Sequence, residues 1–132
     1  MKINRITLIL LVLLMGVLTA CQSDSNETIT IDDQNAGDVI EMQVGDMLVV
    51  SLDGNITTGF NWVPAPQDPV LLEQVGDTEV TPEGEGLGAP GKIVLQFKAI
   101  SEGQTPLTFE YKRAWEEDVE PEKTFEVTIV VK

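Results

Sequence analysis

The sequence predicts an all-β protein, a single immunoglobulin-like antiparallel β-sandwich. Three runs near the C-terminus alternate apolar and polar residues, and no stretch of useful length has the apolar spacing of an amphipathic helix. Turn signals separate the short strand-like runs at intervals of roughly 8 to 12 residues. Alternation of this kind buries one face of each strand and exposes the other, as in antiparallel sheets packed face to face.

The first 20 residues are expected to be a signal peptide and not part of the fold. Lys2 and Arg5 precede an apolar run over residues 6–18, which suits a signal peptide and is too short to span a membrane. Leu18-Thr19-Ala20-Cys21 follows, the pattern of a bacterial lipoprotein signal, in which cleavage leaves Cys21 as a lipid-bearing N-terminus. The alternative is a plain secretory signal with an incidental cysteine. Cys21 is the only cysteine, however, and a lone cysteine in a secreted domain suggests a modification or an external bond.

Three segments are therefore expected: a lipoprotein signal peptide over residues 1–20, a lipidated N-terminus and flexible tether over residues 21–28, and one domain over residues 29–132. Residues 22–26 are polar and rich in Ser and Asp, as a tether would be. The expected location is the bacterial cell envelope, with the protein anchored by lipid to a membrane. In a cell with two membranes, Gln22 after Cys21 is compatible with the outer membrane, facing the periplasm.

The composition favours a binding protein over a catalyst. The chain has no histidine, so with Cys21 assigned to the anchor it offers no Ser-His or Cys-His dyad and no Cys/His metal site. Loss of Lys2 and Arg5 with the signal changes the net charge from −14 to −16, which repels nucleic acid. Adjacent carboxylates such as Asp32-Asp33 fit a solvated face better than an acid/base pair. We expect no catalytic residue, cofactor or metal, and no membrane contact except through the lipid.

The first half of the chain contains several short strands. Residues 29–31 and 47–52 read as strands, as does the run over residues 39–44, which places Ile40, Met42 and Val44 on one face. Three prolines in residues 64–69 predict a loop or a sheet edge. Residues 70–75 fit either a helical turn or a strand, and residues 77–81 are expected to be extended.

The second half holds three strands with clear inner faces. Their predicted buried residues are Ile93, Leu95, Phe97 and Ala99 in the first, Leu107, Phe109 and Tyr111 in the second, and Phe125, Val127, Ile129 and Val131 in the third.

Three irregular stretches lie between these strands: residues 53–59, the glycine-rich residues 84–91, and the segment that begins at Arg113. If each strand reverses the direction of the one before it, all three stretches share one rim. Asp53-Gly54-Asn55 turns the chain out of its strand, and Gly59 offers a second site for positive φ. Trp115 is expected to be exposed because it lies past the alternating run and just before the acidic residues 116–122. The alternatives are an ordinary polar hairpin loop over residues 55–59 and a Trp115 that packs into the core.

The same stretches resemble the chagasin family, the immunoglobulin-like protein inhibitors of papain-type cysteine proteases. Asn55-Ile56-Thr57-Thr58-Gly59-Phe60 matches the family's Asn-Pro-Thr-Thr-Gly-aromatic loop, Gly88-Ala89-Pro90-Gly91 approximates its Gly-x-Gly-Gly loop, and Arg113-Ala114-Trp115 matches its Arg-Pro-Trp loop. The sequence departs from the family at Ile56 and Ala114, where the family has Pro, and at Pro90, where it has Gly. Loss of a proline leaves a loop freer before binding.

The resemblance implies a reversible, non-covalent inhibitor of papain-type cysteine proteases that inserts three loops into the active-site cleft. It implies that the protease contacts all the residues of these three motifs, with backbone groups of the first loop pairing as an extended peptide would. The domain is expected to act as a monomer. The alternative is an envelope-anchored adhesion or ligand-binding module that uses the same rim, because a sandwich hosts many functions.

Overall fold

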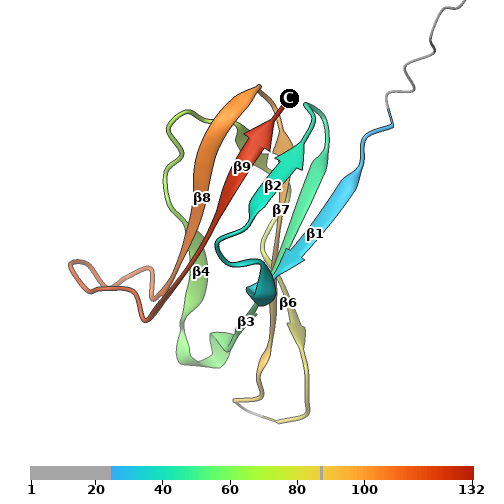
Figure 1. Cartoon of the computed structure of the whole chain (residues 1–132). Coiled ribbons are helices and arrows are strands. Elements are labelled where there is room, and N and C mark those ends of the chain that lie inside the picture. The colour runs from blue at the N-terminus through green and yellow to red at the C-terminus, as the bar shows by residue number, and fades with distance from the viewer. Residues whose placement is uncertain (1–24, 87) are drawn as a thin grey trace, which may run out of the picture.

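The computed structural model describes residues 25–86 and 88–132, which form two β-sheets packed face to face (Figure 1). The strands are β1 (Thr28–Asp32), β2 (Val39–Met42), β3 (Met47–Gly54), β4 (Asn61–Pro64), β5 (Leu72–Gln74), β6 (Glu79–Pro82), β7 (Gly91–Ala99), β8 (Gly103–Lys112) and β9 (Lys123–Val131). Two short 3₁₀ turns, η1 (Asp33–Asn35) and η2 (Ile56–Thr58), complete the described elements. The predicted all-β sandwich is confirmed. Within these ranges no helix has the length and apolar character to span a membrane.

One sheet has the order β1-β3-β7-β5, with β6 also paired to β7, and the other has the order β2-β9-β8-β4. The prediction of purely antiparallel sheets was wrong at two edges, because β1 runs parallel to β3 and β2 runs parallel to β9. After β1 the chain crosses from one sheet to the other through η1, so β2 pairs with a strand distant in sequence. A crossover of this kind allows parallel pairing, whereas a hairpin would impose antiparallel pairing.

The core lies between the two sheets and follows the predicted alternation. Every inner-face residue predicted for β7, β8 and β9 is buried, and β3 adds Leu48, Val50 and Leu52. Phe109 is central, with ring centroids 5.7 Å from Phe97 and 6.3 Å from Phe125. The contact between Phe97 of β7 and Phe109 of β8 joins the two sheets, whereas Phe125 of β9 lies beside Phe109 in the same sheet.

The N-terminal half shows where a local pattern was insufficient. Val44 was predicted to share a buried face with Ile40 and Met42, but β2 ends at Met42 and Val44 is 47% exposed in the following turn. The turn forms because Asp46 accepts hydrogen bonds from the backbone N–H of Gln43 (2.8 Å) and of Glu27 (2.9 Å). The ambiguous residues 70–75 contain a strand, β5, which pairs with the end of β7.

The strand directions show which connections lie at each end of the sandwich. β3, β6 and β8 run toward one end, from which the chain returns in β4, β7 and β9. That end is the lower one in Figure 1 and carries all three predicted loops. We call it the loop rim. The opposite end, where the chain enters β1, carries the turns over residues 43–46 and 100–102 and the connection over residues 65–71, and we call it the tether end.

Candidate protease-binding rim

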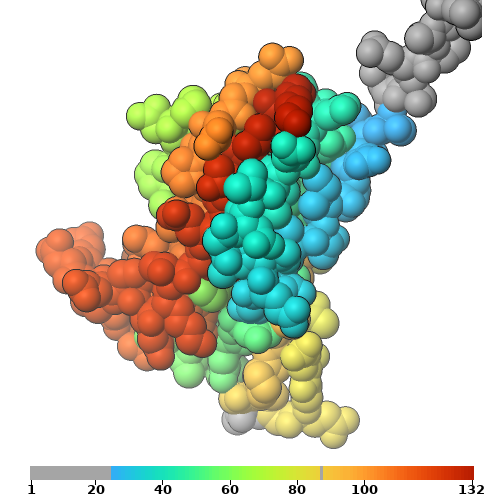
Figure 2. Space-filling view, in the orientation of Figure 1, coloured from blue at the N-terminus to red at the C-terminus, as the bar shows by residue number. Residues whose placement is uncertain are grey.

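Three loops make up the loop rim: the first over residues 55–60, the second over residues 83–90 and the third over residues 113–122. In the space-filling view the third loop projects to one side and the second loop to the other, with the first loop between them (Figure 2). The prediction that these segments share one end of the sandwich is therefore confirmed by the strand directions. Residue 87 of the second loop lies outside the described residues, as does Cys21.

The first loop is a 3₁₀ turn closed by its own hydrogen bonds. Asn55 caps η2, because its side-chain oxygen accepts from the N–H of Thr57 (3.1 Å) and from the hydroxyl of Thr57 (2.6 Å). The Thr58 hydroxyl donates to the Asn55 carbonyl (2.8 Å), and the Gly59 N–H donates to the Ile56 carbonyl (2.9 Å). Gly59 ends the turn in the left-handed region with φ 81°, which favours glycine. The positive φ expected at Gly59 is confirmed.

Gly54 was expected to allow a positive φ in the turn, but it takes none, because it is the last residue of β3 and pairs with Gly91. Its missing side chain matters for a different reason. A Cβ atom at Gly54 would overlap Ile93 and come within 3.3 Å of Tyr111. Gly54 therefore lets the end of β3 lie close against the core beneath the first loop.

Hydrogen bonds from the first loop to both neighbours hold the rim together. Asn55 donates from its side-chain amide to the Gly88 carbonyl of the second loop (2.9 Å). On the other side, Arg113 Nε donates to the Thr58 carbonyl (2.9 Å). The same guanidinium pairs with Glu116 (2.9 Å) and lies 4.4 Å from the centre of the Phe60 ring. Arg113 is thus occupied within the rim, where it stabilises the first and third loops against each other.

An aromatic layer supports the first loop from below. Tyr111 stacks on Phe60 with a centroid distance of 5.2 Å and contacts Trp62 at 5.0 Å. The Asn55 N–H donates to the Tyr111 hydroxyl (2.8 Å). Trp62 Nε1 donates to the Asp53 carbonyl (2.9 Å), which anchors the end of β3. This role of Tyr111 was not predictable, because nothing in a strand's alternation shows which hydroxyl will reach a loop 56 residues away.

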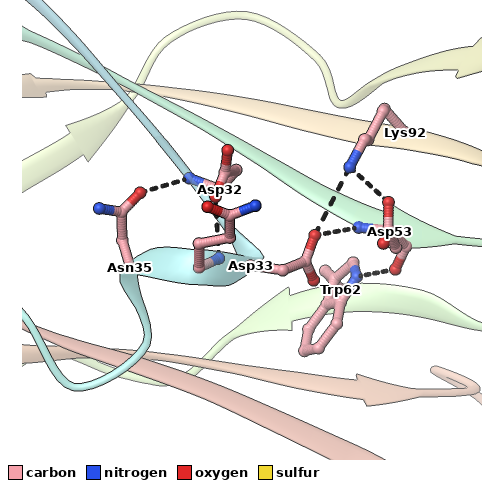
Figure 3. Close-up of polar contacts among 7 residues, drawn as sticks. Asp32, Asp33, Asn35, Asp53, Trp62 and Lys92 are labelled. Carbon is pink, nitrogen blue, oxygen red and sulfur yellow. Dashed lines mark hydrogen bonds and ion pairs between the residues drawn. The ribbon is translucent and has the colours of Figure 1, made fainter.

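A polar brace joins η1 to the base of the first loop (Figure 3). Lys92 pairs with Asp53 and with Asp33, and Asp33 also accepts from the Asp53 N–H (3.0 Å). The hydrogen bond with Asp53 raises the pKa of Lys92 above its usual value, against the opposing effect of desolvation. Lys92 is therefore charged at neutral pH. The pair Asp32-Asp33 is structural, since Asp32 caps η1 by accepting from the Gln34 N–H (2.8 Å).

Exposure separates the predicted contact residues into three groups. Trp115 is 68% exposed, which confirms its predicted exposure, and Ile56, Thr57, Thr58, Gly88, Pro90 and Ala114 are exposed as well. Asn55, Gly59, Phe60, Ala89 and Arg113 are half-buried. Gly91 is buried as the first residue of β7, where a Cβ atom would lie 2.7 Å from the Thr81 carbonyl. Gly91 therefore shapes the base of the second loop and offers little surface to a partner.

The edge of the Trp115 indole lies against Gly59, where an added Cβ atom would overlap Cη2 of the ring. An open hollow of about 430 Å³ lies between the loops. The hollow is lined by Asp53, Gly54, Asn55, Thr58, Phe60, Pro90, Tyr111, Arg113, Glu122 and Lys123. Over the described part of the chain, no group of three or more acidic, His or Cys side chains could hold a metal ion. The rim is thus suited to binding a macromolecule through shape, with one exposed aromatic side chain.

Comparisons with known proteins agree with this geometry. The family model described as chagasin family peptidase inhibitor I42 matches residues 41–129. Amoebiasin-2 of Entamoeba histolytica is 28% identical over 96 residues, which cover 70% of this chain and 76% of that protein. The crystal structure of the cysteine protease inhibitor EhICP2 from Entamoeba histolytica superposes with a TM-score of 0.70 at 18% identity, over 82% of this chain and 98% of that one. PbICP-C, solved in complex with falcipain-2, has a TM-score of 0.51 at 18% identity, over 82% and 93% of the two chains. The two structural matches show a shared fold.

Proposed function

Because the chain belongs to the chagasin family of peptidase inhibitors, we propose that its loop rim blocks the active-site cleft of papain-type cysteine proteases. The inhibition is reversible and non-covalent, and the protein is not an enzyme. The family match favours this function over an adhesion or ligand-binding module. A related fold, PbICP-C, has been solved in complex with falcipain-2, which supports a cysteine protease as the partner.

The observation that carries the proposal is that hydrogen bonds link the first loop to both neighbouring loops. Asn55 reaches Gly88, and Arg113 reaches Thr58. Binding costs free energy for every loop that must be ordered on contact, so loops already joined bind with a smaller loss of entropy. The bond from Arg113 also restrains a third loop that has Ala114 where the family has Pro. These contacts support a rim that is ready to bind before it meets the protease.

The conformation of the first loop accounts for resistance to cleavage. A peptide that pairs with a partner as an added strand is extended and offers its backbone groups outward. Here residues 56–58 form a 3₁₀ turn, and the Thr57 and Gly59 N–H groups are bonded within the loop. Cleavage also requires a carbonyl held in line with the nucleophile at about 3 to 3.5 Å. A closed turn can fill the cleft without offering a carbonyl in that geometry.

The flanking loops would brace the protease on both sides of the cleft. In the third loop Trp115 offers a large exposed ring, and in the second loop Gly88 and Pro90 are exposed. Exposed aromatic side chains on a rigid frame are typical energetic anchors of interfaces. Arg113 contributes mainly by holding the loops, because its Nε and Nη1 are already bonded within the rim.

Inhibition without a covalent bond predicts that the protease's reactive thiol is unnecessary. We expect a papain variant whose catalytic Cys is changed to Ala to bind with an affinity close to that of active papain. Isothermal titration calorimetry measures this directly, and the Trp115→Ala inhibitor, expected to bind both proteases more weakly, shows whether the same rim is used. Loss of binding to the Ala variant, or slow cleavage between Thr58 and Gly59 by active papain, would contradict the mechanism.

We also propose that Cys21 is lipidated and anchors the protein to a bacterial membrane, with residues 1–20 removed as a signal peptide. The support is the pattern over residues 18–21 and the absence of any other cysteine from the sequence. In a cell with two membranes, we propose the outer membrane, facing the periplasm. The domain acts as a monomer.

Replacement of Cys21 by serine tests the anchor. The Cys21→Ser protein is expected to move from the membrane fraction to the soluble fraction, because no acyl chain can be attached. Immunoblotting of fractionated cells measures the shift. Ser23→Ala is a matched control, since it changes a neighbouring small residue and leaves Cys21 in place. A Cys21→Ser protein that still sediments with membranes would argue against lipidation.

A further inference from the structure

The chain enters the domain at the end of the sandwich opposite the loop rim. The Glu27 N–H donates to Asp46 (2.9 Å), and the Met47 N–H donates to the Glu27 carbonyl (2.8 Å). The first bond fixes the start of β1 to the turn over residues 43–46, and the second fixes it to the first residue of β3. Since β1 begins at Thr28, Glu27 and Thr28 belong to the folded domain, although both fall within the expected tether over residues 21–28.

Exposed aliphatic side chains occur at this same tether end. Val44 is 47% exposed, Val70 is 58% exposed and Ile100 is 42% exposed. Backbone hydrogen bonds bring their segments together: the Gly45 N–H donates to the Ala99 carbonyl (2.9 Å), and the Ile100 N–H donates to the Leu71 carbonyl (2.8 Å). The tether end thus combines the chain entry with aliphatic residues that the domain leaves uncovered.

The loop rim is more acidic: five of the seven residues from Glu116 to Glu122 are acidic, whereas the turns and the connection of the tether end hold only Asp46, Asp68 and Glu102. Only Glu116 among them has an ion-pair partner in the described structure, which is Arg113. Anionic headgroups repel carboxylates within about a Debye length of the bilayer surface. The electrostatic term therefore disfavours any orientation that brings the third loop to the bilayer.

The lengths of the tether and of β8 also favour an orientation with the tether end toward the bilayer. Six residue steps separate Cys21 from Glu27, which at about 3.3 to 3.6 Å each limits the tether to about 20 Å. β8 runs from the tether end to the loop rim in ten residues, or about 30 Å. A tether of this length keeps the tether end near the bilayer, while the loop rim lies farther away.

We propose that the tether end of the sandwich, with Val44, Val70 and Ile100, faces the lipid bilayer and that the three loops point into the aqueous phase. The inhibitor then works while anchored and captures proteases that approach the membrane surface from solution. This inference rests on the proposed lipidation of Cys21, and it adds an orientation that lipidation alone does not supply.

The test uses the lipidated full-length chain in vesicles of phosphatidylethanolamine and phosphatidylglycerol with acyl chains brominated near the headgroups. Two tryptophan probes are placed in a Trp115→Phe background: Ile100→Trp at the tether end, and Val119→Trp in the third loop as a matched control. Val119 is also an exposed aliphatic residue, at 56%. Trp62 is buried and adds a constant background signal.

We expect brominated lipid to reduce the emission of the Ile100→Trp probe and to leave that of the Val119→Trp probe unchanged, while aqueous acrylamide quenches Val119→Trp in bound and free protein alike. Equal loss of emission from both probes, or no loss from either, would overturn the proposal. Vesicle flotation reports separately on lipidation, and inhibition of papain in solution by the Cys21→Ser protein reports on the inhibitory function. Failure of either is therefore distinguishable from failure of the orientation.

Discussion

Replacing Trp115 with alanine is expected to weaken inhibition of papain by about tenfold or more, with little change in the thermal unfolding midpoint. The indole is 68% exposed, so folding loses little buried surface when it is removed. Truncation of an aromatic anchor in an interface often costs about 2 kcal/mol or more, and about 1.4 kcal/mol corresponds to a factor of ten in affinity. Inhibition constants from progress curves and a thermal melt measure the two effects independently.

The matched control is Val119→Ala, which truncates another exposed side chain of the third loop. It is expected to change neither the inhibition constant nor the midpoint. A large fall in the midpoint of Trp115→Ala would mean that the indole holds the domain together through its contact with Gly59. An unchanged inhibition constant would remove Trp115 from the binding surface altogether.

The parts of the fold that could be predicted are those specified by a local alternation of apolar and polar residues. In β7, β8 and β9 the alternation from Ile93 to Val131 is long enough to define both faces, and burial follows it at every inner position. The parallel pairing of β1 with β3 and of β2 with β9 was not predictable in this way, because strand direction depends on which distant strand becomes the neighbour. Val44 was misplaced because the alternation continues past the residue where the Asp46 side chain ends the strand.

For the loop rim, the reversal of direction from strand to strand was enough to predict that the three loops share one end. The place of Trp115, just after an alternating run and just before an acidic segment, was enough to predict its exposure. The contacts between loops were not predictable. Arg113 stays predicted to contact the protease, but the sequence did not show that its Nε also bonds to Thr58, 55 residues earlier in the chain. The Asn55 side chain and the threonine hydroxyls close the turn of the first loop through bonds that a sequence pattern does not show. Side-chain bonds across such separations leave no periodic signal in a sequence.

Gly59 connects these observations, because it closes the 3₁₀ turn and also supports the Trp115 ring. Its φ of 81° is strained for any residue with a Cβ atom, and the Cβ atom itself would occupy the place of the ring edge. Backbone strain and steric overlap therefore each oppose a side chain at this position. Gly76 separates the two effects, since its φ is 71° but a Cβ atom there would meet nothing within 4 Å.

Gly59→Ala is accordingly expected to weaken inhibition by nearly as much as Trp115→Ala, through displacement of the indole, and to lower the free energy of unfolding by about 1 to 2 kcal/mol through strain. Gly76→Ala should show a similar loss of stability with unchanged inhibition. The decisive measurement is the double variant. If Gly59 acts by positioning Trp115, the effect of Gly59→Ala on the inhibition constant should largely disappear once the ring is removed, giving a coupling energy of about 1 kcal/mol or more. Additive losses would mean that Gly59 and Trp115 contact the protease independently, and that the preformed contact between them does not contribute to affinity.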